Sequence, residues 1–97
     1  MPAEEVRRRF LDPDDRIVTL SEEAWGHIVR EHPELRWCEP LIAETVSFPD
    51  DRGDDPRADR ERYYSEGKGP SRYFCVVVEY VGAEGDVITA FGHRNER

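Results

Sequence analysis

The sequence predicts an α+β fold in which N-terminal helices pack on one face of a three- to four-stranded antiparallel sheet. Helical patterns precede residue 50, whereas the longest apolar run, Tyr73–Val81, comes late and is followed by a second extended segment. Helices followed by consecutive strands are typical of helices segregated to one face of an antiparallel sheet. A chain of 97 residues has the length of one domain. We therefore expect a polar arm, frayed or briefly helical, over residues 1–15 and a single domain over residues 16–97.

The first half of that domain is expected to contain a short strand and two helices. Residues 16–20 form a brief extended run, and Ser21 is a good N-cap for a helix with two glutamates in its first turn. This helix should end near His32, because the residue before a proline is disfavoured in the helical conformation. A second helix begins near Pro40, since proline is accepted in a first helical turn, and ends before Pro49.

The second half is expected to form the sheet. Residues 50–62 contain six acidic residues and four arginines, which predicts a surface loop with at most a weak edge strand. A strand begins at Arg62–Tyr64, and Tyr73–Val81 is apolar on both alternating faces, as in a central strand with cover on both sides. Gly82–Gly85 predicts a four-residue hairpin loop, after which Asp86–Phe91 returns antiparallel.

The composition limits the size of the core and the class of protein. Hydrophobic and charged residues each make up 37% of the chain, so the core must be small. No apolar run approaches the ~18 residues of a membrane-spanning helix, and no apolar stretch follows the first five residues as in a signal peptide. The two cysteines do not make a disulfide framework. We expect a reduced cytoplasmic protein with no membrane association.

The net charge of −8 bears on possible partners. Binding to nucleic acid rests largely on neutralising phosphates, so an enzyme that acts on nucleic acid usually shows a basic face. Residues 1–62 hold 17 acids and 10 bases, whereas residues 63–97 hold 5 acids and 4 bases. Residues 63–97 could thus present a locally neutral or basic surface to RNA, and a basic partner protein is an equally natural interpretation.

All three histidines lie close to arginines in the sequence. His27, Arg30 and His32 fall at the end of the first helix, and His93 and Arg94 follow the last strand. Histidine takes and gives a proton near neutral pH, and arginine holds a phosphate with two hydrogen bonds. These groups are the ones that metal-free cleavage of a phosphodiester requires: a base, an acid and positive charge for the transition state.

Several motifs stand in a recognisable order: W-x-H-I-x-x-x-H-P-E-L at Trp25–Leu35, P-D at Pro49-Asp50, R-x-Y at Arg62–Tyr64, an apolar strand at Phe74–Val78, and V-x-T-A-F at Val87–Phe91. In this the chain resembles, over residues 16–94, the phage-associated branch of the barnase–EndoU–colicin–RelE nuclease superfamily. The resemblance implies helices followed by a four-stranded antiparallel sheet, metal-independent RNA cleavage, and a toxin or phage-encoded role. The chain departs from the family in its acidic balance and in the charged residues after Pro49-Asp50.

The first hypothesis is therefore a metal-independent endoribonuclease without cofactors, acting on RNA. Its catalytic residues are His32, His27, Arg62 and Thr89, and its substrate-binding residues are Arg30, Tyr64, His93 and Arg94. The two helix histidines share the acid–base work, and the arginines stabilise the phosphate. Structural explanations remain open beside these roles: His32 could cap a helix carbonyl, and Thr89 could be present because threonine favours strands.

A second hypothesis is a catalytically inactive, protein-binding module of the same fold, antitoxin-like or accessory to a phage. Its partner would be a cognate antitoxin or another protein, and the acidic balance favours it. No metal site is expected, because the histidine and cysteine spacing matches no common structural-zinc pattern.

Overall fold

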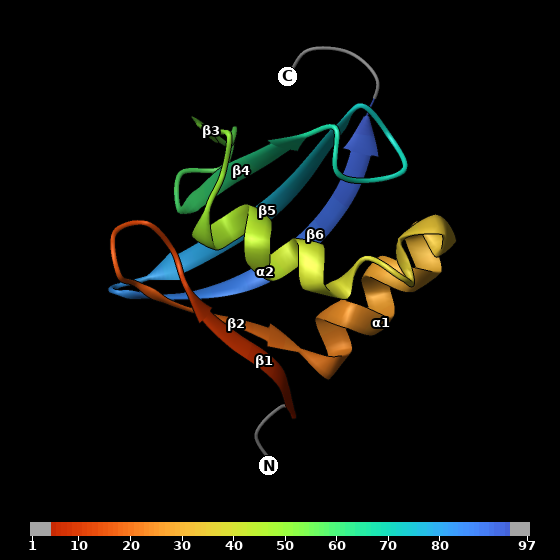
Figure 1. Cartoon of the computed structure of the whole chain (residues 1–97). Coiled ribbons are helices and arrows are strands. Elements are labelled where there is room, and N and C mark those ends of the chain that lie inside the picture. Colours follow the sequence, from red (N-terminus) through yellow and green to blue (C-terminus); the bar gives the residue numbers. More distant parts are fainter. Residues whose placement is uncertain (1–4, 94–97) are drawn as a thin grey trace.

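In residues 5–93, which the computed structural model describes, six strands form one mixed sheet in the order β1-β2-β6-β5-β4-β3 (Figure 1). Neighbouring strands are antiparallel, except that β2 and β6 pair in parallel over a short stretch. Along the chain the elements are β1 (Val6–Leu11), β2 (Ile17–Ser21), α1 (Glu22–Glu31), a 3₁₀ turn (Pro33–Leu35), α2 (Glu39–Ser47), β3 (Asp51–Asp54), β4 (Arg60–Glu66), β5 (Tyr73–Val81) and β6 (Glu84–His93).

The predicted antiparallel sheet of three to four strands is wrong, because two charged segments also form strands and β2 runs parallel to β6. The first charged strand, β1, lies within residues 1–15, where an arm was expected. Its side chains are mostly exposed, and Arg7 bridges Glu22 of α1 and Glu39 of α2 at 2.9 and 3.1 Å. An edge strand held by ladder hydrogen bonds and ion pairs needs no apolar alternation, so the sequence pattern does not reveal it.

The second charged strand, β3, forms the opposite edge of the sheet. Residues 50–62 are therefore not a continuous loop, because β3 occupies Asp51–Asp54 and β4 already begins at Arg60. The alternative of a weak edge strand is the one that the structure confirms. The pairing places Asp51 opposite Tyr64 and Gly53 opposite Arg62, so β3 adds a charged border to the strand that carries Arg62.

The two helices begin and end where local chemistry predicts. The hydroxyl oxygen of Ser21 accepts a hydrogen bond from the backbone N–H of Ala24 at 3.0 Å and so caps α1. At the other end, the backbone N–H of His32 donates to the carbonyl of Ile28 at 2.8 Å, and Pro33 starts a 3₁₀ turn. The predicted second helix is confirmed as α2, with proline in its first turn.

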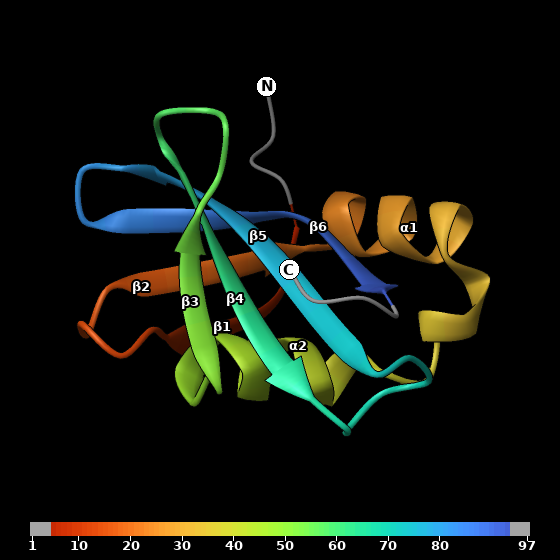
Figure 2. The ribbon, with the colours of Figure 1, turned by 90° about the horizontal axis from the view of Figure 1, so that it is seen from above.

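The core lies between the helices and one face of the sheet. Its buried side chains include Ile28 of α1, Ile42 and Val46 of α2, and Phe74 and Val76 of β5. The opposite face, here called the open face, has a smaller buried cluster made of strand residues: Tyr64, Cys75 and Val77, with Phe91 packed against them. In Figure 2 strands β3, β4 and β5 pass in front of α2, so this view looks onto the open face. The expected cover on both sides of β5 is thus supplied by a helix on one face and by aromatic side chains on the other.

Helix α1 takes the place beside β6 that β2 leaves vacant. Strand β2 pairs with β6 only from Ile17 to Thr19, and α1 follows directly from its end. Figure 2 shows α1 continuing the line of β2 and running alongside the second half of β6. Because of this position, α1 borders both the core and the open face. Side chains of α1 that do not point into the core can therefore contact those of β6.

The hairpin between β5 and β6 is tighter than predicted, since β6 already begins at Glu84 and Gly82 takes the left-handed conformation at φ 63°. Gly85 lies in β6, where a Cβ atom would come within 2.6 Å of the Tyr80 ring and 2.7 Å of the Val78 side chain.

We expect Gly85→Ala to lower the free energy of unfolding by about 1–3 kcal/mol, because neither neighbour can move without disturbing the core. Urea unfolding monitored by circular dichroism measures the loss. Gly53→Ala is the matched control, because its Cβ would lie 3.6 Å from the nearest atom, an ordinary contact. An equal loss in both variants would contradict the packing argument.

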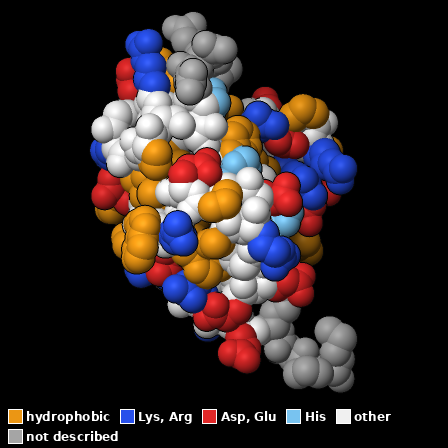
Figure 3. Space-filling view, turned by 90° about the vertical axis from the view of Figure 1, so that its right-hand side faces the viewer, with side chains coloured by type: hydrophobic (Ala, Val, Ile, Leu, Met, Phe, Trp, Pro, Cys, Tyr) orange, Lys and Arg blue, Asp and Glu red, His pale blue; other side chains and the backbone are white. Residues whose placement is uncertain are grey.

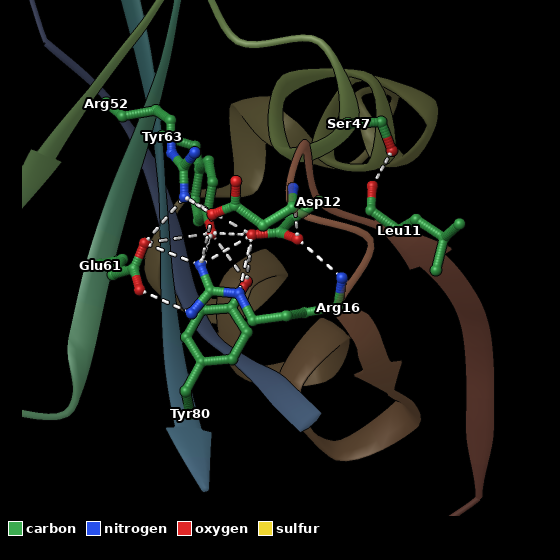
Figure 4. A network of polar contacts seen from close by, with 9 residues as sticks. Leu11, Asp12, Arg16, Ser47, Arg52, Glu61, Tyr63 and Tyr80 are labelled. Carbon is green, nitrogen blue, oxygen red and sulfur yellow. Dashed lines mark hydrogen bonds and ion pairs between the residues drawn. The ribbon is translucent and has the colours of Figure 1, made fainter. Parts of the chain in front are cut away.

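A network of charged and phenolic side chains closes one end of the core (Figure 4). Asp12, whose side chain is fully buried, accepts hydrogen bonds from the Arg16 guanidinium at 2.7 and 3.0 Å and from the Tyr63 hydroxyl at 2.9 Å. Arg16 also reaches Glu61 at 2.8 Å and lies 3.7 Å from the centre of the Tyr80 ring. Burial by itself raises the pKa of Asp12, but these hydrogen bonds outweigh burial and hold that pKa at about 2. Asp12 is therefore ionised and paired at neutral pH.

A second arginine joins this network from β3. The Arg52 guanidinium contacts Asp14 at 2.9 Å and Glu61 at 3.1 Å. The network thus ties the loop between β1 and β2 to strands β3, β4 and β5, which explains how two highly charged edge strands stay attached to a small core. The charged groups of this network pair with one another, so we assign the network a structural role.

Candidate functional site

The strand register brings side chains from three strands together on the open face. Residues that lie directly opposite one another in antiparallel strands project to the same side of the sheet. Across β4, β5 and β6 the register forms three rows on this face: Arg62–Val77–Thr89, Tyr64–Cys75–Phe91 and Glu66–Tyr73–His93. Four residues predicted from the sequence, Arg62, Tyr64, Thr89 and His93, therefore lie on the same face in adjacent rows.

Five rings meet over these rows, and we call them the aromatic cluster: His32, Tyr64, Tyr73, Phe91 and His93. The His93 ring stacks on Tyr73 with centroids 5.6 Å apart and meets Tyr64 edge-on at 6.1 Å. Phe91 lies 6.0 Å from His93 and 6.3 Å from His32. Phe91 is thus the common neighbour of two imidazoles, one from the end of α1 and one from the end of β6.

His32 reaches the open face because α1 ends there. Its φ of −137° is outside the helical range, so the break before Pro33 turns this residue away from the helix axis. The helix carbonyl is capped by the backbone N–H of His32. The imidazole is therefore left to meet Phe91, and its Nδ1 lies 3.8 Å from a carboxylate oxygen of Glu34. At 35% exposure the imidazole is accessible to solvent and yet held between two neighbours.

Arg62 is fixed in place by a carboxylate. Its Nε lies 2.7 Å from Asp55, and the side chain of Asp55 is 7% exposed. The pKa of Asp55 is lowered, first by the backbone N–H of Arg57 and then by Arg62 itself. Burial raises the pKa of the neighbouring Tyr64, so its phenol stays protonated at neutral pH and can donate a hydrogen bond.

Cys75 lies in the middle of the open face, directly opposite Tyr64 and Phe91. Burial raises the pKa of its thiol to about 12, so the thiolate that a nucleophilic mechanism would need is not formed near neutral pH.

His27 and Arg30 lie in a groove between α1 and β6. The groove has a volume of about 970 Å³ and is lined by Ser21, Glu23, Ala24, His27, Arg30, Glu79, Asp86, Val87 and Ile88. Positions 23, 27 and 30 form one stripe along α1, because residues three and four apart share a helix face. Within residues 5–93, Arg30 makes no ion pair, but three carboxylates line the same groove. This part of the surface is therefore acidic on balance.

The predicted site residues thus form two neighbouring sets, one on the open face and one in the groove between α1 and β6. His32, Tyr64 and His93 belong to the aromatic cluster, and Arg62 and Thr89 form the next row. The groove holds His27 and Arg30. Arg94 lies outside the described residues. The structure places His93 beside the ring that His32 contacts, and it places His27 in the groove.

Sequence reasoning missed Phe91 and Tyr73 as members of the site. A signal for Phe91 was available, because Thr89 and Phe91 alternate along the expected strand and must therefore share a face. The expected end of that strand at Phe91 is wrong, because β6 continues to His93 and brings this residue to the same face. The bulge between β5 and β6 precedes Thr89, so it leaves this alternation intact. No comparable signal linked Phe91 to His32, which comes from a distant part of the chain.

The surface on the α1 side of the molecule mixes both signs of charge. Figure 3 shows acidic and basic side chains interspersed there, with histidines between them. In residues 5–93, no group of three or more His, Cys, Asp or Glu side chains is arranged to hold a metal ion. Neither helix in this range has the length and apolar character needed to cross a membrane.

Comparison with known proteins gives no relative for this chain: no protein-family model matches it, and neither a curated protein nor a solved structure is significantly similar.

Proposed function

We propose that the protein is a metal-independent endoribonuclease whose site lies on the open face. The observation that carries the proposal is the placement of two imidazoles, His32 and His93, around Phe91, next to the row that holds Arg62 and Thr89. Within the aromatic cluster this pair takes the acid–base role, in place of the His27–His32 pair that the sequence suggested.

The chemistry follows from these groups. One imidazole, neutral before reaction, removes the proton from a ribose 2′-hydroxyl, and that oxygen attacks the adjacent phosphorus. The other imidazole, protonated before reaction, gives its proton to the departing 5′-oxygen as the phosphorus–oxygen bond breaks. The products are a 2′,3′-cyclic phosphate and a 5′-hydroxyl. Arg62 and the Tyr64 hydroxyl donate hydrogen bonds to the phosphate oxygens as negative charge builds on them.

The test is cleavage of a labelled single-stranded RNA by purified protein in excess chelator. We expect fragments that end in 2′,3′-cyclic phosphate, and no cleavage of an all-2′-deoxy oligonucleotide of the same sequence. Cleavage of the deoxy strand, or cleavage that needs an added divalent cation, would contradict the mechanism. Growth arrest on induced expression would support the toxin-like role that the family resemblance suggests.

The alternative is a catalytically inactive protein-binding module, and two observations favour it. Arg60 and Arg62 on the open face are already paired with Glu79 and Asp55, at 3.1 and 2.7 Å. Trp37 before α2 is 84% exposed, which the ribonuclease proposal leaves unexplained. Absence of cleavage for every RNA tested, with a correctly folded protein, would favour this alternative.

A further inference from the structure

Two arginines of the open face are already paired with carboxylates, whereas the guanidinium of Arg72 lies 5.3 Å from the centre of the Tyr73 ring. Arg62 is held by Asp55 and Arg60 by Glu79, and the chain as a whole carries a net charge of −8. Binding driven by release of counterions from phosphates requires cations that are not already neutralised by carboxylates. Phosphate contacts can therefore position an RNA strand at this site, but they supply only a small part of its affinity.

The aromatic cluster offers a different source of affinity. Tyr64 and Tyr73 are each 7% exposed and form the floor of the cluster, whereas Phe91 and His93 are only partly buried and lie at its surface. A nucleobase that stacks on such rings gains free energy that does not depend on the phosphate charge, and every base has a suitable π-face. Bases in a duplex already stack on one another, so only unpaired bases are free to make this contact.

We infer that the open face binds unpaired nucleotides by stacking their bases on Phe91 and His93, and that this binding depends only weakly on salt. The inference rests on the proposed function and names its substrate class as single-stranded RNA, including the unpaired loops of folded RNA. Phe91 is then a residue that binds substrate, and it also keeps the His32 imidazole beside the base that it holds.

The experiment measures binding separately from cleavage. Fluorescence anisotropy measures the affinity of the protein for two labelled 2′-fluoro RNAs. One RNA is single-stranded, and the other is a fully paired hairpin stem. Neither can be cleaved by the proposed mechanism, because neither has the 2′-hydroxyl that acts as the nucleophile. We expect the single strand to bind at least about tenfold more tightly than the stem. We also expect the slope of log affinity against log salt to be no steeper than about −1, the value for roughly one phosphate contact.

Phe91→Leu tests the stacking contact, because leucine keeps an apolar side chain but has no π-face. We expect it to weaken binding of the single strand at least about fivefold, the effect of losing one stacked base. Phe48→Leu is the matched control and should bind like the unaltered protein, since Phe48 is 75% exposed and follows α2, away from the open face. Urea unfolding of both variants verifies that the fold is kept.

The outcomes separate this inference from the proposed function. Equal binding of the two RNAs, no binding of either, a steep salt slope, or unchanged binding by Phe91→Leu would each overturn the stacking inference, even if unmodified RNA is cleaved. Tight, salt-insensitive binding of the single strand without cleavage of unmodified RNA would uphold the inference and end the ribonuclease proposal.

Discussion

Replacing His32 with alanine is expected to lower the rate of RNA cleavage by about 10²–10⁴-fold, the usual contribution of one general acid or base. The structure gives the reason, because the break at Pro33 brings this imidazole beside Phe91 on the open face. The loss should appear in kcat, measured on labelled single-stranded RNA in chelator.

His27→Ala is the matched control, as it removes an imidazole from the same helix five residues earlier. Its side chain lies in the groove with Glu79 and Asp86, so we expect a loss of less than about tenfold. A loss as large as that of His32→Ala would restore the His27–His32 pair as the acid and base. Cleavage by His32→Ala at the full rate would show that the nuclease activity comes from a contaminant or from another site.

Asp12→Ala is expected to lower the free energy of unfolding by about 3–5 kcal/mol, the usual effect of removing one partner of a buried ion pair. The variant leaves Arg16 with only part of its carboxylate partners and removes the carboxylate that accepts from the Tyr63 hydroxyl at 2.9 Å. For a domain of about 100 residues, each kcal/mol lowers Tm by roughly 4–8 °C. Thermal unfolding at pH 7 measures this directly.

Asp14→Ala is the control for Asp12, because Asp14 belongs to the same loop and also contacts Arg16 and Arg52, but its side chain is 58% exposed. An exposed ion pair contributes at most about 1 kcal/mol. Equal losses in the two variants would contradict the view that burial gives Asp12 its importance.

Unfolding measured at decreasing pH should show the contribution of Asp12 to the stability of the unaltered protein. The pKa of Asp12 is lowered from 3.8 to about 2, so its stabilising effect is complete above pH 4 and is lost as the pH falls toward 2. Asp12→Asn should remove this part of the decline, although the lowered pKa of Glu61 leaves some pH dependence in the variant.

The elements that follow local chemistry could be predicted from the chain alone. Ser21 caps α1, the proline after His32 ends it, and the long apolar run forms the central strand β5 with β6 as its antiparallel neighbour. In each case the determining atoms are only a few residues apart. The resemblance to a nuclease family covered these segments too, but it predicted a smaller, wholly antiparallel sheet, and that prediction was wrong.

The edge strands and the parallel pair could not be predicted in this way. Strand β1 reads Val-Arg-Arg-Arg-Phe-Leu, and β3 reads Asp-Arg-Gly-Asp; neither shows the alternation that marks a half-buried strand. Both strands make ion pairs with distant residues, such as Arg7 of β1 with Glu39 and Arg52 of β3 with Asp14. Such pairs have no periodicity in sequence.

The same distinction between local sequence and distant contacts applies to the candidate site. Residue types and spacing identified histidines, arginines and a strand threonine as suitable for phosphodiester chemistry. The last strand was expected to end at Phe91, and only the continuation of β6 to His93 puts Thr89 and His93 on one face. Contacts between distant segments decide which two histidines come together. Because β2 ends early and α1 takes its place beside β6, the turn at Pro33 delivers His32 to Phe91 and His93, while His27 remains in the groove. Local sequence therefore sets the ends of helices and strands, and contacts between distant segments set which side chains share a site.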